Sequence, residues 1–230
     1  MGKGGNFAVH SWCVIHSTRA RQINFTGTTD DADAADTGGI HKFVLSKGYV
    51  ISPPNLVTQS MQNVLSTLPS SFTPPKIITV STTGLTKSSH SSLPLPLKPL
   101  YTYALKGPHQ DKVGAEKIIA YCAGWSWDDG KVKDDILGKG EEWKEELPKP
   151  GTLTSVVVIR PLLFTDGECK ADKLAGKDGK GKGKAKEPYR VQEGHISGYT
   201  ISRKDVAHFV VEGVLADWQK WEGKCVGIAY

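Results

Sequence analysis

Two short runs of β-branched residues constrain the fold of this chain more than any other feature. KIITVSTTG, at 76–84, and SVVVIRP, at 155–161, each contain an apolar stretch of strand length. The second is nearly all apolar, as expected for a strand covered on both faces. Between them lies YTYALKGPHQDKVGAEKIIA, at 101–120, whose apolar residues repeat at helical spacing. Strand, helix and strand in this order predict an α/β fold built on a parallel sheet.

Further helices and strands are predicted on both sides of this unit. Residues 57–68 and 202–214 carry apolar residues at helical spacing, and the second helix opens with the capping-box spacing of Ser202 and Asp205. Residues 224–230 predict a terminal strand, and residues 7–15 are compatible with another. The prolines in 88–100 predict an extended connection.

The length of 230 residues predicts a single domain, 1–230. Residues 1–50 show little regular pattern. Residues 124–150 place three tryptophans among charges and glycines, and we interpret them as an inserted surface excursion. Residues 170–188 are rich in lysine and glycine and lack the apolar residues that offset the entropy of ordering, so they predict a mobile loop.

Charge and cysteine usage argue against several classes of function. The formal net charge of +5 is concentrated in the lysine-rich run, so no specific nucleic-acid interface is predicted. Scattered cysteines and the lack of metal-ligand spacing predict a reduced, cytoplasmic protein without a metal site. The chain has neither a signal peptide nor a run of about 18 apolar residues, so no membrane span is expected. The oligomeric state is left open.

Candidate site residues gather where the two central strands end. Ser81, Thr82 and Thr83 follow the first strand, and their hydroxyls can bond a substrate or a nicotinamide cofactor at the carboxyl edge of the sheet. Simple capping of the strand end explains them equally well. Lys112, near the start of the predicted helix, can reach a cofactor ribose and lower the pKa of a neighbouring hydroxyl. A solvated lysine paired with Glu116 is the alternative.

The second strand ends in Arg160, Pro161, Leu162 and Leu163. The arginine needs a partner for its charge, and the proline bends the chain so that backbone amides can approach a carboxamide. Arg160 can equally anchor a loop carboxylate.

The run YTYALKGPHQDKVGAEKII, followed by VIRPLLFTDG and GYTISRKDVAHFVVEGV, resembles the atypical short-chain dehydrogenase/reductases, the NAD(P)H-binding, NmrA-like group common in fungi. The resemblance covers about residues 55–230. It implies a Rossmann-like sheet and an NADP- or NAD-dependent reductase of a small carbonyl or enone. Lys112 would hold the nicotinamide ribose, Ser81 or Thr82 would take the place of the active-site hydroxyl, and residues 160–163 would line the nicotinamide.

Two departures from the family pattern keep other functions open. Enzymatic members carry a tyrosine four residues before the lysine, where this chain has Pro108, so Tyr101, Tyr103 or His109 would have to substitute. The expected N-terminal strand, glycine-rich turn and helix are missing, so the predicted fold is N-terminally incomplete, with an exposed sheet edge. The alternatives are a non-catalytic regulatory or partner-binding Rossmann-like module, or a truncated non-functional copy.

Overall fold

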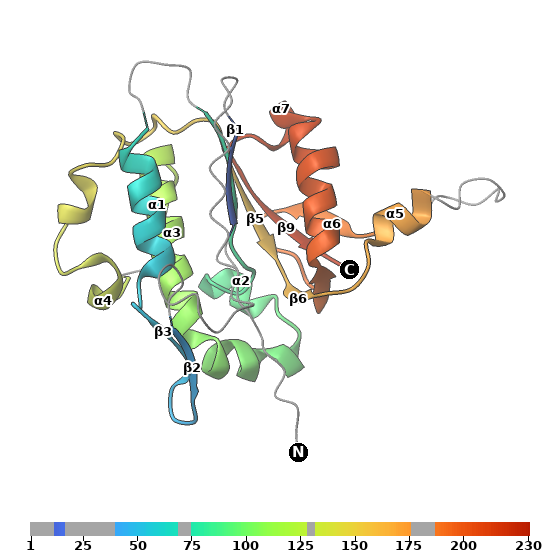
Figure 1. Cartoon of the computed structure of the whole chain (residues 1–230), viewed down its shortest axis with the longest axis horizontal. Coiled ribbons are helices and arrows are strands. Elements are labelled where there is room, and N and C mark those ends of the chain that lie inside the picture. Colours follow the sequence, from blue (N-terminus) through green and yellow to red (C-terminus); the bar gives the residue numbers. More distant parts are fainter. Residues whose placement is uncertain (1–11, 17–39, 69–74, 128–131, 176–186) are drawn as a thin grey trace.

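Three parallel strands form the centre of a five-stranded sheet with the order β1-β4-β5-β9-β7 (Figure 1). The parallel strands are β4 (Lys76–Val80), β5 (Val156–Pro161) and β9 (Lys224–Ala229), and β1 (Trp12–His16) and β7 (Arg190–Glu193) flank them antiparallel. This mixed α/β architecture is consistent with a Rossmann-like fold. The computed structural model describes residues 12–16, 40–68, 75–127, 132–175 and 187–230.

Successive residues of the central strands alternate between two hydrophobic cores, as strand geometry requires. Ile77, Val156 and Val158 belong to the core that α1 (Leu56–Ser66) and α3 (Lys106–Ala123) cover. Their neighbours in the sequence, including Ile78 and Val157, belong to the core on the opposite face. Burial of both faces explains why the sequence shows continuous apolar runs here.

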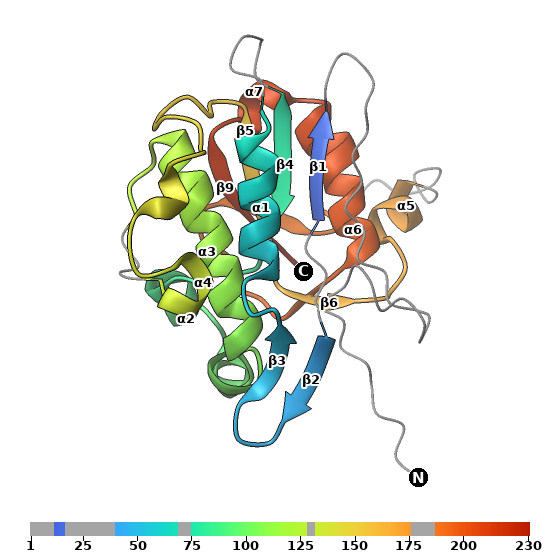
Figure 2. The same cartoon turned by 60° about the vertical axis from the view of Figure 1, so that its left-hand side comes forward.

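Helices cover both faces of the sheet (Figures 1 and 2). On one face lie α1 (Leu56–Ser66) and α3 (Lys106–Ala123). On the other lie α6 (Arg203–His208), the π-helical segment η4 (Phe209–Leu215) and α7 (Trp218–Trp221). The predicted helices over 57–68 and 202–214 are therefore confirmed, and so is the terminal strand.

The cap predicted at the start of α6 is also confirmed. The backbone N–H of Asp205 donates to Ser202 Oγ at 3.0 Å, and the same hydroxyl donates to the Asp205 carboxylate at 2.8 Å. Such a cap satisfies one of the N–H groups that a helix start leaves without an intrahelical partner.

The extended connection predicted for residues 88–100 is wrong. This region contains α2 (Lys87–Ser91), a 3₁₀ turn η1 (Leu95–Leu97) and a π-helical turn η2 (Leu100–Ala104) that leads into α3. Pro94 and Pro99 precede the two short turns, where the lack of a backbone N–H costs nothing because the first helical amides have no intrahelical acceptor. The prolines thus begin helical turns instead of preventing them.

Part of the predicted surface excursion contributes to the core. Within 124–150 lie α4 (Asp134–Leu137) and the 3₁₀ turn η3 (Glu142–Lys144), and Trp143 packs into the core of α1 and α3. The predicted mobile loop does not begin at residue 170, because α5 spans Lys170–Ala175. Residues 176–186 of that prediction lie outside the described part of the chain.

The expectation of an exposed sheet edge at β4 is wrong. Strand β1 pairs with β4 antiparallel, with Trp12 opposite Val80 and His16 opposite Lys76.

Two smaller sheets complete the fold. The hairpin β2 (Ile40–Val44) and β3 (Gly48–Ser52) lies below α1 in Figure 2, and β6 (Leu163–Thr165) pairs parallel with β8 (Thr200–Ser202).

Candidate active site

The predicted hydroxyl residues lie at the carboxyl end of β4, directly beside the end of β5. The N–H of Ser81 donates to the carbonyl of Ile159 at 2.8 Å, and the N–H of Thr83 donates to the carbonyl of Pro161 at 2.9 Å. Backbone pairing with β5 therefore continues beyond β4 and fixes the position of these residues. This is the edge of a doubly wound sheet where ligands bind.

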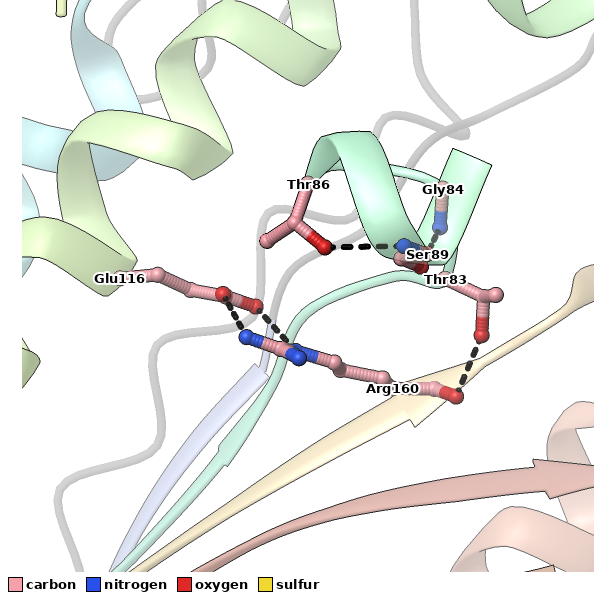
Figure 3. A network of polar contacts seen from close by, with 6 residues as sticks. All are labelled: Thr83, Gly84, Thr86, Ser89, Glu116 and Arg160. Carbon is pink, nitrogen blue, oxygen red and sulfur yellow. Dashed lines mark hydrogen bonds and ion pairs between the residues drawn. The ribbon is translucent and has the colours of Figure 1, made fainter. Parts of the chain in front are cut away.

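The hydroxyls of this segment have different environments. Thr83 Oγ1 donates to the carbonyl of Arg160 at 2.9 Å (Figure 3). Thr82 is half-buried, and its hydroxyl lies 3.3–3.4 Å from the carbonyls of Thr83 and Pro161. Ser81 Oγ is buried and has no hydrogen-bond partner in the described part of the chain. An unpaired buried hydroxyl costs about 1–3 kcal/mol. A ligand that reached this atom would offset that cost by forming the missing hydrogen bond.

Lys112 is buried, in contrast to the solvated lysine of the alternative interpretation. Its side chain is 4% exposed, and Nζ lies 3.5 Å from the carbonyl oxygen of Ser81. Burial lowers the pKa of Lys112 to about 8, although the negative charges of Glu116 and Asp111 oppose this shift. A lysine on α3 is thus brought to the end of β4, as the site prediction requires.

Glu116, one helical turn beyond Lys112, pairs with Arg160. The guanidinium group contacts both carboxylate oxygens, from Nε at 3.1 Å and from Nη2 at 2.5 Å (Figure 3). Both residues are buried. The partner of Arg160 is therefore a carboxylate on a helix, not on a loop, and this ion pair lies between α3 and the end of β5.

The residues after Arg160 are largely committed to the core. Leu162 is 1% exposed and packs with Leu93 and Ile196, and its N–H donates to the carbonyl of Ile228 at 3.3 Å. Pro161 is buried and Leu163 is half-buried in β6. The sequence predicted that backbone amides after Pro161 could bind a carboxamide. The N–H group of Leu162, however, already has an acceptor within the fold.

Asp111 was not singled out in the sequence, although it is fully buried next to Lys112. Its carboxylate accepts hydrogen bonds from the N–H groups of Val57 and Thr58, both at 2.8 Å. Asn55, at the start of α1, makes no side-chain cap, so Asp111 caps α1 from the neighbouring helix. Burial raises the pKa of Asp111, and these hydrogen bonds oppose the shift.

The three candidates for the missing tyrosine occupy different environments. Tyr103 is 45% exposed, while Tyr101 and His109 are buried with their rings 5.1 Å apart. Burial raises the pKa of Tyr101 to about 12, opposed by a hydrogen bond with the Thr82 side chain. Burial, and then the charges of Lys112 and His90, lower the pKa of His109 to about 3, so its imidazole is neutral near pH 7. Pro108 is buried in the first turn of α3.

A short turn after Thr83 is held rigidly (Figure 3). Gly84 has φ +87°, and its N–H donates to Ser89 Oγ at 2.5 Å. The N–H of Ser89 in turn donates to Thr86 Oγ1 at 3.1 Å, which caps α2. A Cβ on Gly84 would lie 2.7 Å from the ring of Tyr101, so glycine is needed here for space as well as for its backbone conformation.

Comparison with known proteins places this chain in a family. No protein-family model matches the chain, and no solved structure matches it. Among curated proteins it is similar to Reductase pytE of Aspergillus terreus, with 30% identity over 211 residues that cover 88% of this chain and 68% of that protein. The chain belongs to this reductase family. The reductase part of the sequence-based resemblance is thereby confirmed, whereas the short-chain dehydrogenase/reductase assignment and its NmrA-like subgroup remain predictions.

The structure adds two observations on other classes of site. In the described ranges, no helix is long and apolar enough to cross a membrane. Within the same residues, no group of three or more histidine, cysteine, aspartate or glutamate side chains is arranged to hold a metal ion.

Proposed function

We propose that this member of the reductase family is an NADP- or NAD-dependent reductase of a small carbonyl or enone. The observation that carries the proposal is the position of Lys112, whose Nζ lies 3.5 Å from the Ser81 carbonyl at the carboxyl end of a parallel strand. The unpaired Ser81 hydroxyl lies on the same residue. A buried cation and a free donor at this edge fit a ribose and a carbonyl oxygen, respectively.

In this proposal, each residue has a distinct role. Lys112 donates hydrogen bonds to the ribose hydroxyls, and Ser81 Oγ donates to the substrate carbonyl oxygen on which negative charge develops. Thr82 supports or replaces Ser81, since it is the next residue after Ser81, at the end of β4, and is half-buried. A bound nicotinamide cofactor would supply the hydride.

Tyr101 is the best of the three candidates to supply the proton. Its hydroxyl is buried and stays protonated near pH 7, because burial raises the pKa of Tyr101 to about 12. His109 is neutral and buried against the Tyr101 ring, and Tyr103 is exposed. In this role the Tyr101 hydroxyl would deliver its proton to the substrate oxygen as the hydride is transferred.

A second function, a non-catalytic regulatory or partner-binding module, is favoured by the enclosure of Lys112. The residue is 4% exposed, and among the described residues it lines neither a hollow of about 400 Å³ nor another of about 730 Å³. Cofactor binding would require the residues that cover Lys112 to move.

Titration with NADPH and with NADH separates the two functions. Saturable binding, followed by nucleotide fluorescence, that Lys112→Ala weakens about tenfold or more supports the reductase. Lys106→Ala is the matched control, because Lys106 is an exposed lysine of the same helix. Absence of binding by a chain that unfolds cooperatively would contradict the reductase proposal and favour the non-catalytic module.

A further inference from the structure

A surface hollow of about 730 Å³ is lined by none of the residues assigned to the candidate active site. Two segments line it: one contains Leu93 and Pro94, which lie between α2 and η1, and Leu95, which begins η1, and the other contains Ser197, Gly198 and Tyr199. Its volume lies within the range of about 300–1,000 Å³ that is common for small-molecule sites.

The charge of the hollow favours an anion. Lys98 and Arg190 line it, and none of its lining residues carries a carboxylate side chain. Arg190 Nη2 is already engaged, because it donates to the main-chain oxygens of Ser197 and of Tyr230, the last residue of the sequence, at 2.6 and 2.7 Å. The proposal therefore rests on Lys98, which is half-buried and has no ion-pair partner within the residues that the structure describes.

The apolar surface of the hollow favours a flat ligand. Tyr199 is 56% exposed and Leu95 is 77% exposed. Both residues therefore offer apolar surface to a ligand in the hollow. An aromatic ring offers its face to a second planar group at low cost in conformational entropy.

The wall that carries Tyr199 is held in place by the core beneath it. A Cβ on Gly198 would lie 2.9 Å from the side chains of Leu162 and Ala229, so this segment packs closely on the core. Tyr230 is fixed as well, because its hydroxyl donates to Asp205 Oδ2 at 2.5 Å. A wall that is already ordered loses little entropy when a ligand binds.

We propose that this hollow binds a planar organic acid, with its carboxylate at Lys98 and its apolar ring against Tyr199. This site is separate from the cofactor site proposed above, and the binding does not depend on reductase activity.

The test is a calorimetric titration of the full chain, without nucleotide, with trans-cinnamate, naphthalene-2-carboxylate and the neutral trans-cinnamyl alcohol. Saturable binding of at least one acid is expected, with the alcohol about tenfold weaker or more. Lys98→Gln and Tyr199→Ser should each weaken binding of that acid by about tenfold. Lys106→Gln and Tyr103→Ser are the matched controls, because they remove an exposed lysine and an exposed tyrosine outside the hollow.

Three outcomes would overturn the site. These are failure of both acids to bind the folded wild-type chain, equal affinity for acid and alcohol, and binding that neither hollow variant weakens. Because nucleotide is absent from the titration, failure here leaves the reductase proposal intact, and failure of NADPH binding leaves this one intact.

Discussion

Arg160 and Glu116 form a buried ion pair in which the guanidinium group donates two hydrogen bonds to the carboxylate, at 3.1 and 2.5 Å. The pair connects the end of β5 to α3, one turn beyond Lys112. Arg160 contacts both oxygens of the Glu116 carboxylate, and the Lys112 ammonium lies 3.5 Å from the Ser81 carbonyl oxygen.

Removal of one partner of this pair is expected to destabilise the fold strongly. Arg160→Met leaves the Glu116 carboxylate buried without its cation, a change that costs about 3–5 kcal/mol in the free energy of unfolding. Urea denaturation measures the loss. Asp166→Asn is the control, since it breaks the exposed pair with Arg203 and should change stability little. Equal effects of the two substitutions would contradict a structural role for the buried pair.

Lys112 is expected to make stability rise as the pH increases above about 8. The pKa is about 8 in the folded chain and near its ordinary value of 10.5 when unfolded. Between these values the unfolded state binds more protons, so the free energy of unfolding increases with pH. Near pH 7, Lys112→Met should therefore be more stable than wild type by on the order of 3 kcal/mol, and the difference should narrow toward pH 10. Urea unfolding across this range measures it, and a pH-independent difference would argue against a lowered pKa.

Ser81→Ala is expected to separate activity from stability. The Ser81 hydroxyl has no partner in the described structure, so its removal should leave the free energy of unfolding unchanged or slightly higher. Thr83→Val, by contrast, removes the donor to the Arg160 carbonyl and should cost about 1–3 kcal/mol. NADPH consumption with a small enone should fall in Ser81→Ala if the proposed role is correct. Full activity of a well-folded Ser81→Ala variant would shift that role to Thr82.

Gly84→Ala is expected to destabilise the chain through two effects. The positive φ costs about 1–2 kcal/mol for an alanine. The new methyl group also meets the Tyr101 ring at 2.7 Å, and overpacking adds about 1–3 kcal/mol. Gly151→Ala isolates the first effect, because φ is +80° there and no atom lies within 4 Å of the added Cβ. Thermal unfolding of both variants should show a clearly larger loss at Gly84, and similar losses would refute the steric effect.

The sequence predicted correctly those helices and strands that are determined by the spacing of apolar and capping residues close together in the chain. The apolar run of β5 and the helical spacing of α1 both predicted what the fold contains. The capping spacing of Ser202 and Asp205 did the same for α6. The prediction for residues 88–100 was wrong because proline is excluded from the interior of a helix but not from the start of a short helical turn.

The candidate site depends on contacts between distant parts of the chain, which local pattern does not encode. Lys112 lies 31 residues from Ser81, and Arg160 lies 44 residues from Glu116. The burial of Lys112 and the pairing of Glu116 with Arg160 therefore had no local signal. The sequence does indicate that Arg160, at the end of an apolar strand, needs a buried partner for its charge. It does not indicate that this partner is Glu116, which lies at i+4 from Lys112.

Because Asp111 on α3 caps α1, hydrogen exchange in the first turn of α1 should depend on the separation of α1 from α3. The N–H groups of Val57 and Thr58 have their acceptors on α3, so neither can exchange with deuterated solvent by fraying of α1 alone. Their exchange should follow undocking of α3 and should match the slow amides of that helix. We therefore expect α1 and α3 to open as one cooperative unit, although 39 residues separate the end of the first from the start of the second.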